Sequence, residues 1–422
     1  MSLSAPGVDA TRRRMLVAGL GAAAASALPL RAWAAPACDY ARDWMPPQAF
    51  LDDLPRQMQA LGVPAIGIAV VEGGKLAWSQ VRGVLHAKLG TPAGEDTIFE
   101  VASLSKPVFA YAVLQLVDRG ELALDRPLVS YLRPDYLARH AWVDKITVRD
   151  VLRHSSGLPN WRKDPAHELL MPMVEPGTRI DYSGEAMVWL QLVVESITGE
   201  SLDATMQRLL FKPAGMRDSS YGWSDALALR SVYGHGTPDE MAASGMPAQM
   251  LREQWSAAQP VARRWRKPLS DWRYADAQRA LAEVQAASPA GLVNWAGDIL
   301  ANSAASLRCT VQDYARFMAA MVADPPPAWG LRPATRELML TRQIDVPGRW
   351  TDKSLGWNIE HTPQGPVFYH SGSNGNIFKA FAMGDARRQR ALVVLTNATQ
   401  GNVLYRRVVR AATGLDLLAF DV

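Results

Sequence analysis

The chain has 422 residues, of which 48% are hydrophobic and 20% are charged, a composition typical of folded globular proteins and unlike that of disordered chains. Its formal net charge is +4, and removing the first 34 residues, which hold four arginines and one aspartate, leaves +1. A nearly neutral chain gives no electrostatic case for a nucleic acid or an anionic membrane as a partner.

The first 34 residues have the pattern of an export signal. Three arginines at 12–14 precede a Gly/Ala-rich apolar stretch that ends at Leu30, and Ala32-Trp33-Ala34 fits a small-x-small cleavage site. The apolar stretch is short for a membrane span and rich in alanine, so we expect cleavage and no stable span. The pattern predicts recognition by the twin-arginine export machinery and a periplasmic or secreted protein.

The chain contains two cysteines, Cys38 and Cys309. In an oxidising compartment they can form one disulfide or remain two free thiols, and the sequence leaves both states open. No Cys/His spacing is typical of a zinc site and no His-Glu-x-x-His occurs, so neither a metal nor another cofactor is predicted.

Predicted strands lie near both ends of the mature chain, and predicted helices fill its middle. A helix at 47–61 precedes a hairpin with strands at 65–71 and 75–81. Helices follow at 107–119, 183–198, 201–210 and 310–322. Strands return at 367–370, 377–383 and 391–396, before a last helix at 403–412. The strand at 391–396 lacks polar alternation, so we expect it to be covered on both faces.

This order predicts a mixed α/β (α+β) fold, in which one antiparallel sheet made from both chain ends carries helices on its faces. The sheet subdomain would take about 45–125 and 340–422 of a single domain at 35–422. A helical subdomain at about 126–339 would be inserted, with the site in the cleft between the two. Residues 237–290, with three tryptophans and a basic cluster at 263–267, form either a solvated helical insertion or a lid.

Ser103 and Lys106 stand three residues apart at the start of an apolar helix. On a helix this spacing puts both side chains on one face, so the Ser103 hydroxyl can pass its proton to the Lys106 amine. The helix is apolar nearly all round, which places it in the core. Burial and the positive end of the helix dipole both disfavour the ammonium and lower the lysine pKa. The pair is therefore a candidate nucleophile and base.

Three further segments carry polar residues suited to a site. The segment 181–184, Asp-Tyr-Ser-Gly, precedes a predicted helix, and a buried phenol there can relay protons. The segment 370–373, His-Ser-Gly-Ser, ends a predicted strand, where small residues let a substrate lie close. In the turn at 152–159, His154 is interpreted as a structural hydrogen-bonding residue. Ser155 and Ser156 are rival nucleophiles, but neither has a lysine three residues on.

The order Ser-x-x-Lys, Tyr-Ser-x and His-Ser-Gly, with His-Ser-Ser-Gly-Leu-Pro between the first two, resembles the class C β-lactamase-related serine hydrolases over about 50–414. That group includes β-lactamases, D-alanyl-D-alanine carboxypeptidases, D-aminopeptidases and esterases. The resemblance implies a β-lactamase/transpeptidase-like fold, with Ser103 as the acyl-accepting nucleophile and Lys106 as its base. Tyr182 would protonate the leaving group and help activate the deacylating water.

The resemblance also implies how the substrate is held. Backbone amides of Ser103 and Ser373 would form the oxyanion hole. His370 would be catalytic, at the place where many relatives carry the lysine of a Lys-Thr-Gly triplet. The remaining motif positions are predicted to contact substrate: Ser183, Gly184, Ser371, Gly372 and Asn374.

Two departures from the family pattern bear on the reaction. Gly184 replaces the asparagine that is usual in relatives that cleave β-lactams, and His370 removes a charge that is permanent at neutral pH. Both changes favour an esterase or a broad amidase. We therefore predict a serine hydrolase that acts on an ester or amide bond of a small molecule or a peptidoglycan-derived fragment. A D-Ala-D-Ala carboxypeptidase or β-lactamase remains an alternative, as does a non-catalytic peptidoglycan-binding or regulatory module on the same fold.

Overall fold

The computed structural model describes residues 43–164, 167–236, 246–287, 301–345 and 351–420. The predicted export signal and Cys38 lie outside the described residues, whereas Cys309 is fully buried in the core. Among the described helices, none is long and apolar enough to cross a lipid bilayer.

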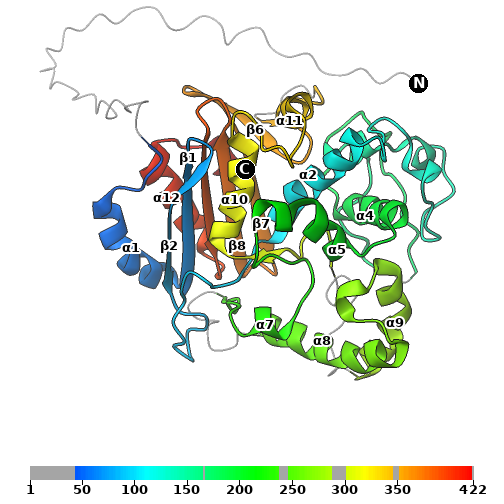
Figure 1. The fold of residues 1–422 in the computed structure, drawn as a ribbon, viewed down its shortest axis with the longest axis horizontal. Helices are drawn as coiled ribbons and strands as arrows, with labels where there is room; N and C mark the ends of the chain where they lie inside the picture. Colours follow the sequence, from blue (N-terminus) through cyan, green and yellow to red (C-terminus); the bar gives the residue numbers. More distant parts are fainter. Residues whose placement is uncertain (1–42, 165–166, 237–245, 288–300, 346–350, 421–422) are drawn as a thin grey trace, which may run out of the picture. The chain divides into compact units, whose positions relative to one another are not determined.

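A seven-stranded sheet in the order β2-β1-β9-β8-β7-β6-β5 forms the centre of the fold, and every neighbouring pair is antiparallel. Because β1 pairs with β9, the two ends of the chain build one sheet, as predicted (Figure 1). The strands are β1 (Ala65–Glu72), β2 (Lys75–Gly83), β5 (Asp352–Lys353), β6 (Asn358–Thr362), β7 (Gly365–Asn374), β8 (Phe378–Asp385) and β9 (Arg390–Thr396). A two-stranded sheet pairs β3 (Phe99–Glu100) with β4 (Arg308–Cys309).

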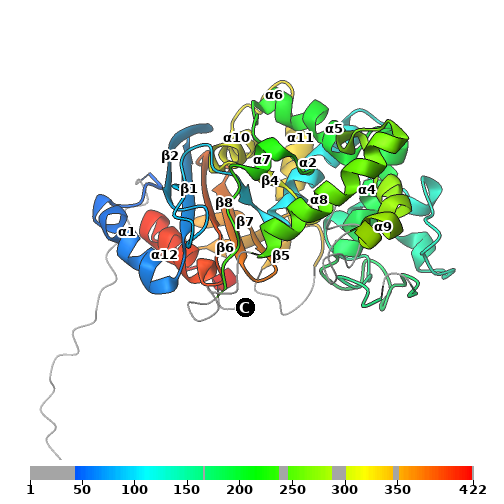
Figure 2. The same ribbon diagram turned by 90° about the horizontal axis from the view of Figure 1, so that it is seen from below.

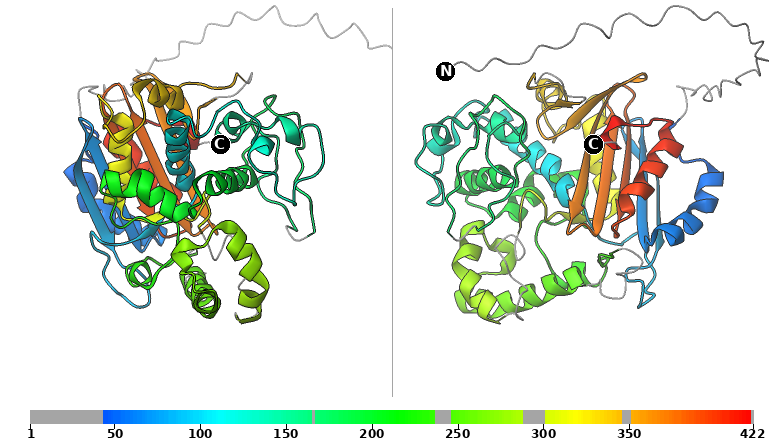
Figure 3. Two further views of the ribbon diagram at one scale, coloured as in Figure 1. Left: turned by 45° about the vertical axis from the view of Figure 1, so that its right-hand side comes forward. Right: turned by 180° about the vertical axis from the view of Figure 1, so that it is seen from behind.

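Helices cover both faces of the large sheet, as Figures 2 and 3 show. On one face α1 (Gln48–Leu61) and α12 (Gly401–Thr413) pack against alternate residues of β1, namely Ile66, Ile68 and Val70. The residues between them face the other side, where α10 (Val311–Val322) lies against β1 and β9. Because successive side chains of a strand point to opposite faces, β1 contributes to the hydrophobic cores on both sides of the sheet.

Strands β5 and β6 have no counterpart among the predicted strands, and two further differences concern the sheet. Strand β7 is longer than the predicted 367–370, because its Ser-Gly-Ser end still pairs with β8 although those small residues give no strand pattern. The helix at 311–322 lies on the sheet, although the predicted division placed it in the helical subdomain. Its amphipathic stripe has a buried sheet face to cover, which the sequence order alone does not show. The division into subdomains otherwise stays a prediction.

The helical part lies beside the sheet and begins with η2 (Ala102–Leu104) and α2 (Ser105–Asp118) (Figure 1). Helix α2 is buried over most of its length, as its apolar sequence predicts. The predicted helix at 201–210 is α5 followed by a π-helical turn, since Pro213 has no N–H to continue a regular α-helix. The other helices are α3 (Val148–Leu152), α4 (Gly184–Thr198), α5 (Leu202–Met206), α6 (Lys212–Ala214), α7 (Asp225–Ala228), α8 (Met246–Trp265), α9 (Tyr274–Ala287) and α11 (Pro333–Leu340). Short turns complete it: η3 (Leu128–Ser130), η4 (Val143–Lys145), η5 (Gln207–Phe211), η6 (Leu269–Asp271) and, after α12, η8 (Leu418–Phe420).

The described part of the 237–290 segment is helical, in agreement with the sequence. Helices α8 and α9 form a hairpin with a small apolar core of its own, in which the rings of Trp265 and Trp272 stack with centroids 5.2 Å apart. That core includes Val188 of α4, so the hairpin packs on the helix that follows Tyr182. Whether the segment acts as a lid stays a prediction.

Candidate active site

The backbone turn that carries Ser103 is held in an unusual conformation. Ala102, the residue before it, has a left-handed φ of 51°, which costs a residue with a Cβ about 1–2 kcal/mol. The Ser105 hydroxyl donates to the Ala102 carbonyl at 2.5 Å and accepts from the Leu307 amide at 3.0 Å. A strained turn persists only where its surroundings fix it, and here they fix the position of the Ser103 hydroxyl.

Two buried phenols donate hydrogen bonds to two further carbonyls of the same turn. Tyr314 donates to the carbonyl of Leu104 at 3.0 Å, and Tyr221 donates to the carbonyl of Ser105 at 2.6 Å. Burial raises the pKa of both phenols well above the ordinary value, so they remain donors at any physiological pH.

Lys106 lies in the first turn of α2, directly beside Ser103. Its Nζ atom is 3.2 Å from Ser103 Oγ and donates to the Ala304 carbonyl at 2.8 Å, and the residue is only 1% exposed. Burial, followed by the positive charge of Lys353, lowers the pKa of Lys106 well below its ordinary value. A neutral amine has a lone pair, which can accept the Ser103 proton across the same 3.2 Å contact.

Tyr182 comes from the segment before α4 and lies over the lysine. The Lys106 Nζ is 4.5 Å from the centroid of the Tyr182 ring, and the His154 ring stacks on that ring with centroids 4.4 Å apart. Burial raises the pKa of Tyr182, and the neighbouring Ser103 hydroxyl opposes that rise. His154 also accepts from the Ser183 amide at 3.3 Å, which is the structural role expected of it.

The segment 370–373 lies inside β7, at an edge that faces the serine. Pairing of β6 with β7 ends at Tyr369, while pairing with β8 continues to Asn374, so among the described strands this stretch has one open edge. A Cβ at Gly372 would lie 2.4 Å from the Val101 carbonyl oxygen and 3.1 Å from the Ser103 amide nitrogen. Only glycine permits that approach, which brings the next residue, Ser373, close to Ser103, the other residue of the predicted oxyanion hole.

His370 contributes a buried imidazole to the same edge. Its Nδ1 lies 2.7 Å from the carbonyl oxygen of Ser371, and since a carbonyl only accepts, Nδ1 carries the proton. Burial, then the charges of Lys353 and Lys106, lower its pKa well below the ordinary value. The imidazole is therefore neutral, and its Nε2 is a buried acceptor without a hydrogen-bond partner among the described residues.

These groups line one cleft of about 530 Å³. Of the ten predicted site residues, eight line it: Ser103, Lys106, Tyr182, His370, Ser371, Gly372, Ser373 and Asn374. Asn374 uses its side-chain amide to donate to the Ala305 carbonyl at 3.0 Å and to the carboxylate of Glu100.

The two remaining residues, Ser183 and Gly184, do not line the cleft in the described structure. Ser183 is buried and caps α4, because its hydroxyl accepts from the Ala186 amide at 3.0 Å and donates to the Pro159 carbonyl at 2.8 Å. Gly184 begins α4 and lies against the ring of Trp161. A substrate role for these two residues stays a prediction.

Sequence reasoning missed several lining residues, of which Lys353 matters most for the electrostatics. It lies on β5, is 7% exposed, and its Nζ is 5.8 Å from the centroid of the Tyr182 ring. The described lining includes the lysines 106, 353 and 379 and neither aspartate nor glutamate. Because Lys106 is held neutral, the positive charge of this lining comes from the lysines 353 and 379. None of the sequence motifs that predicted the site includes Lys353.

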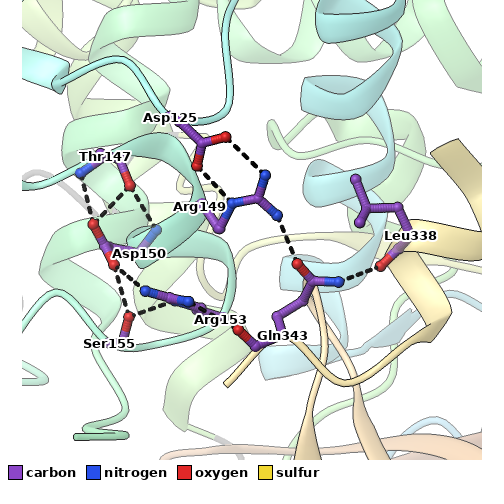
Figure 4. A network of polar contacts seen from close by, with 8 residues as sticks. All are labelled: Asp125, Thr147, Arg149, Asp150, Arg153, Ser155, Leu338 and Gln343. Carbon is purple, nitrogen blue, oxygen red and sulfur yellow. Dashed lines mark hydrogen bonds and ion pairs between the residues drawn. The ribbon is translucent and has the colours of Figure 1, made fainter. Parts of the chain in front are cut away.

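A polar network holds the strand of Lys353 against α3 (Figure 4). The backbone amide of Gln343 donates to the backbone carbonyl of Lys353 at 2.8 Å, and the backbone carbonyl of Gln343 accepts from the Arg153 guanidinium at 2.8 Å. Arg149 donates to the Gln343 side chain at 2.6 Å. Asp150 accepts from both Arg153 and Ser155, at 2.8 and 2.9 Å, so the rival serine at 155 is part of this framework.

The other missed residues come from loops, from strands β6 and β8 and from the first half of α12. They are Asn160, Trp161, Ile180, Ala305, Asn358, Lys379, Asn402 and Tyr405. Among the described residues, no group of three or more His, Cys, Asp or Glu side chains is placed to hold a metal ion.

Comparison with known proteins accounts for this arrangement. The sequence model of the Beta-lactamase family matches residues 51–414. The chain belongs to the Beta-lactamase family. Members of this family, which include esterases, penicillin-binding proteins and β-lactamases, are serine hydrolases, and the predicted family and fold are thereby confirmed.

Curated relatives match over part of their length. Esterase EstB from Burkholderia gladioli is 32% identical over 219 residues, which cover 45% of this chain and 55% of that protein. Penicillin-binding protein 4 from Amycolatopsis lactamdurans is 31% identical over 187 residues, covering 41% and 49%. The chain thus spans about half the length of these relatives.

Solved structures share the fold over most of the chain. A class C beta-lactamase has a TM-score of 0.63 at 18% identity, covering 87% of this chain and 95% of that chain. D-alanine carboxypeptidase AmpC from Burkholderia cenocepacia has a TM-score of 0.61 at 17% identity, covering 87% and 99%. At such identities the likeness shows the fold alone.

Proposed function

We propose that this protein hydrolyses an ester or amide bond through an acyl-enzyme on Ser103, without a metal or other cofactor. The observation that carries the proposal is the 3.2 Å contact between Lys106 Nζ and Ser103 Oγ, at a lysine whose pKa burial holds far below its usual range. A base that is neutral at physiological pH beside a serine is the arrangement that nucleophilic catalysis needs.

In the acylation step, Ser103 Oγ bonds to the substrate carbonyl carbon while its proton passes to Lys106 Nζ. The backbone amides of Ser103 and Ser373 receive the developing oxyanion. The bond from that carbon to the leaving oxygen or nitrogen then breaks, and Tyr182 delivers a proton to the departing group. The proton on Lys106 replaces the one that Tyr182 gives up, so the charge in the cleft is restored.

In the deacylation step, a water bonds to the acyl carbon and the bond to Ser103 Oγ breaks. The neutral His370 can take the proton from this water at Nε2, a buried acceptor without a hydrogen-bond partner among the described residues. Tyr182 carries its own proton at this stage, so it can take the water proton only as a relay that passes its own proton to the neutral Lys106. Ser103 Oγ regains a proton as it leaves, which completes the cycle.

The substrate class follows from what the cleft offers. An ester or a broad amide substrate on a small molecule or a cell-wall fragment suits a cleft in which Gly184 supplies no side-chain amide. The similarity to an esterase supports this choice. One observation favours a D-Ala-D-Ala carboxypeptidase or β-lactamase as second candidate, because the lysines 353 and 379 give the cleft positive charge that suits a substrate carboxylate.

The first test is labelling of the mature protein with a fluorophosphonate, followed by intact mass and peptide mapping. We expect one adduct, located on Ser103, and none on a Ser103→Ala variant. Ester, D-Ala-D-Ala peptide and β-lactam panels then rank the substrate classes. A folded protein that forms no adduct would refute the proposal and favour a binding module on the same fold.

We also propose that the protein acts in the periplasm or outside the cell after twin-arginine export. The supporting observation is the pattern of residues 1–34. The N-terminal sequence of the protein purified from its native host tests this, with a start near residue 35 expected. Retention of Met1 in cytosolic material would contradict it.

A further inference from the structure

The ring of Trp161 occupies the place that a side chain at position 184 would take. A Cβ built on Gly184 would lie 2.2 Å from Trp161 Cζ2, 2.3 Å from Cη2 and 2.7 Å from Cε2. Carbon atoms do not approach within 3 Å without a bond, so any residue but glycine at 184 requires the ring to move. The glycine and the tryptophan therefore form one unit.

The segment around Trp161 is tied to the first turn of α4 on both sides of the ring. Asn160 accepts from the Gly184 amide through its side chain at 2.9 Å, and from the Gly184 and Glu185 amides through its carbonyl at 3.1 and 3.0 Å. Arg162 donates to the Glu185 carboxylate through its backbone amide at 3.1 Å and through its guanidinium at 2.9 and 3.1 Å.

The Arg162–Glu185 pair is itself buried, with side chains 8% and 4% exposed. A buried, bidentate pair of this kind fixes geometry more firmly than a surface ion pair does. Trp161 stands between two anchored neighbours, so its position in the cleft wall is set by the fold.

Packing also supports the ring. Trp161 is half-buried and contacts both the main core and the small core of the α8–α9 hairpin. It lines the cleft together with Ile180, which is buried. An indole ring and an isoleucine side chain give that stretch of the wall an apolar surface.

We propose that Trp161 is a specificity-determining residue that receives an apolar substituent of the substrate, a role that rests on the proposed hydrolase function. The absence of a side chain at Gly184 is what admits the ring to the wall. A substrate whose apolar chain packs on the ring gains transition-state binding, whereas a chain with a charged or amide-bearing end must give up hydration to pack there.

The substituent can belong to either side of the scissile bond, so the test has two arms. In the first, p-nitrophenyl esters keep the leaving group constant and lengthen the acyl chain from acetate to butyrate to hexanoate. In the second, acetate esters lengthen the alcohol from ethanol to butanol to hexanol. The wild-type protein should show kcat/KM rising with chain length in one arm, by roughly tenfold over two to four methylenes.

Trp161→Ala should flatten that rise, and Trp161→Phe should preserve most of it. Trp142→Ala is the matched control, because Trp142 is also half-buried in the helical part but does not line the cleft. We expect this control to keep the wild-type profile. Unchanged chain-length profiles of Trp161→Ala in both arms would overturn the proposal.

A double-mutant cycle tests the pairing of Gly184 with Trp161 by a measurement other than activity. Gly184→Ala alone should lower Tm by several degrees, because the ring must leave its place. In a Trp161→Ala background the same change should cost little, so the two effects are far from additive. Additive shifts in Tm would refute the steric unit. Fluorophosphonate labelling of every variant separates this result from the hydrolase proposal, whose failure would appear as no adduct in the wild-type protein.

Discussion

The two walls of the cleft are built by different means. The wall with Ser103 is fixed by hydrogen bonds from Ser105, Tyr221 and Tyr314 to a strained turn. The facing wall is set by the shape of Trp161 against Gly184 and by the charge of Lys353. The first wall keeps the family motif, while the second departs from it. The difference supports the proposal that one side of the cleft holds the reacting groups and the other selects the substrate.

The largest expected effect comes from breaking the first wall at its nucleophile. Ser103→Ala should lower kcat by on the order of 10⁶-fold, because no covalent intermediate can form. Lys106→Ala should lower it by about 10³-fold, since the base is lost while the serine remains. Steady-state kinetics with circular dichroism as a control for folding measures both. A Ser103→Ala variant with near wild-type turnover would place the chemistry elsewhere.

The second expected effect is a pH dependence of stability that arises from Glu195 on α4, the helix that begins at Gly184 of the second wall. Burial raises the pKa of Glu195 to about 7 from an ordinary value of 4.5, against hydrogen bonds from Gln191 and Tyr274 that lower it. The folded state therefore binds this proton more tightly than the unfolded state does. The resulting stabilisation is complete below about pH 4.5 and is lost as pH rises toward 7, by about 3 kcal/mol in all.

Urea unfolding of Glu195→Gln between pH 5 and 8 measures this effect. The variant loses one hydrogen-bond acceptor at every pH, which lowers its free energy of unfolding by a constant amount. The diagnostic quantity is therefore how the difference in unfolding free energy, wild type minus variant, changes with pH. We expect that difference to fall as pH rises. Glu200→Gln is the matched control, because the side chain of Arg208 lowers the pKa of Glu200 from its ordinary value of 4.5, so that its wild-type-minus-variant difference should stay constant from pH 5 to 8. Parallel curves for wild type and Glu195→Gln would contradict the assignment.

The sequence predicted the wall with Ser103 better than the facing wall. The Ser-x-x-Lys spacing on an apolar helix was enough to predict a serine beside a buried lysine, since three residues of helix fix their relation. The small residues at 370–373 predicted a segment along which a substrate can lie, but not that the strand continues through them to Asn374. Trp161, Lys353 and Asn402 were not predicted because their place depends on contacts distant in sequence, such as Arg153 with Gln343 and the loop at 159–162 with α4. No local pattern marks such residues.

The third prediction asks whether the Ser103 turn is held by more contacts than it needs. Tyr221→Phe removes the donor to the Ser105 carbonyl, a bond of 2.6 Å in the core. We expect the free energy of unfolding to fall by about 2 kcal/mol, because a buried acceptor loses a partner, while kcat changes less than about tenfold. Denaturant unfolding and kinetics measure the two. Tyr314→Phe, one carbonyl away, is the matched variant. A large loss of kcat at unchanged stability would show that one phenol alone positions the serine.

The smallest expected effect joins the two walls through charge. The ammonium of Lys353, on the second wall, is the second cause after burial of the lowered pKa of Lys106, on the first. Lys353→Met removes the charge but keeps a long side chain, so the pKa of Lys106 should rise. Lys106 must be neutral to accept the serine proton, and the acid limb of the kcat/KM profile should therefore move to higher pH.

Lys379→Met is the control for this last experiment. Lys379 lines the same cleft, but its ammonium donates to Ser373 at 2.9 Å and to Asn376 at 2.6 Å, and its charge is not among the causes of the Lys106 shift. We expect its variant to change KM for anionic substrates and to leave the acid limb in place. If both variants shift the acid limb of the profile equally, the lowered pKa of Lys106 reflects the total positive charge of the cleft. If only Lys353→Met shifts it, the family's lost lysine at position 370 has been replaced in its electrostatic effect by a lysine on β5.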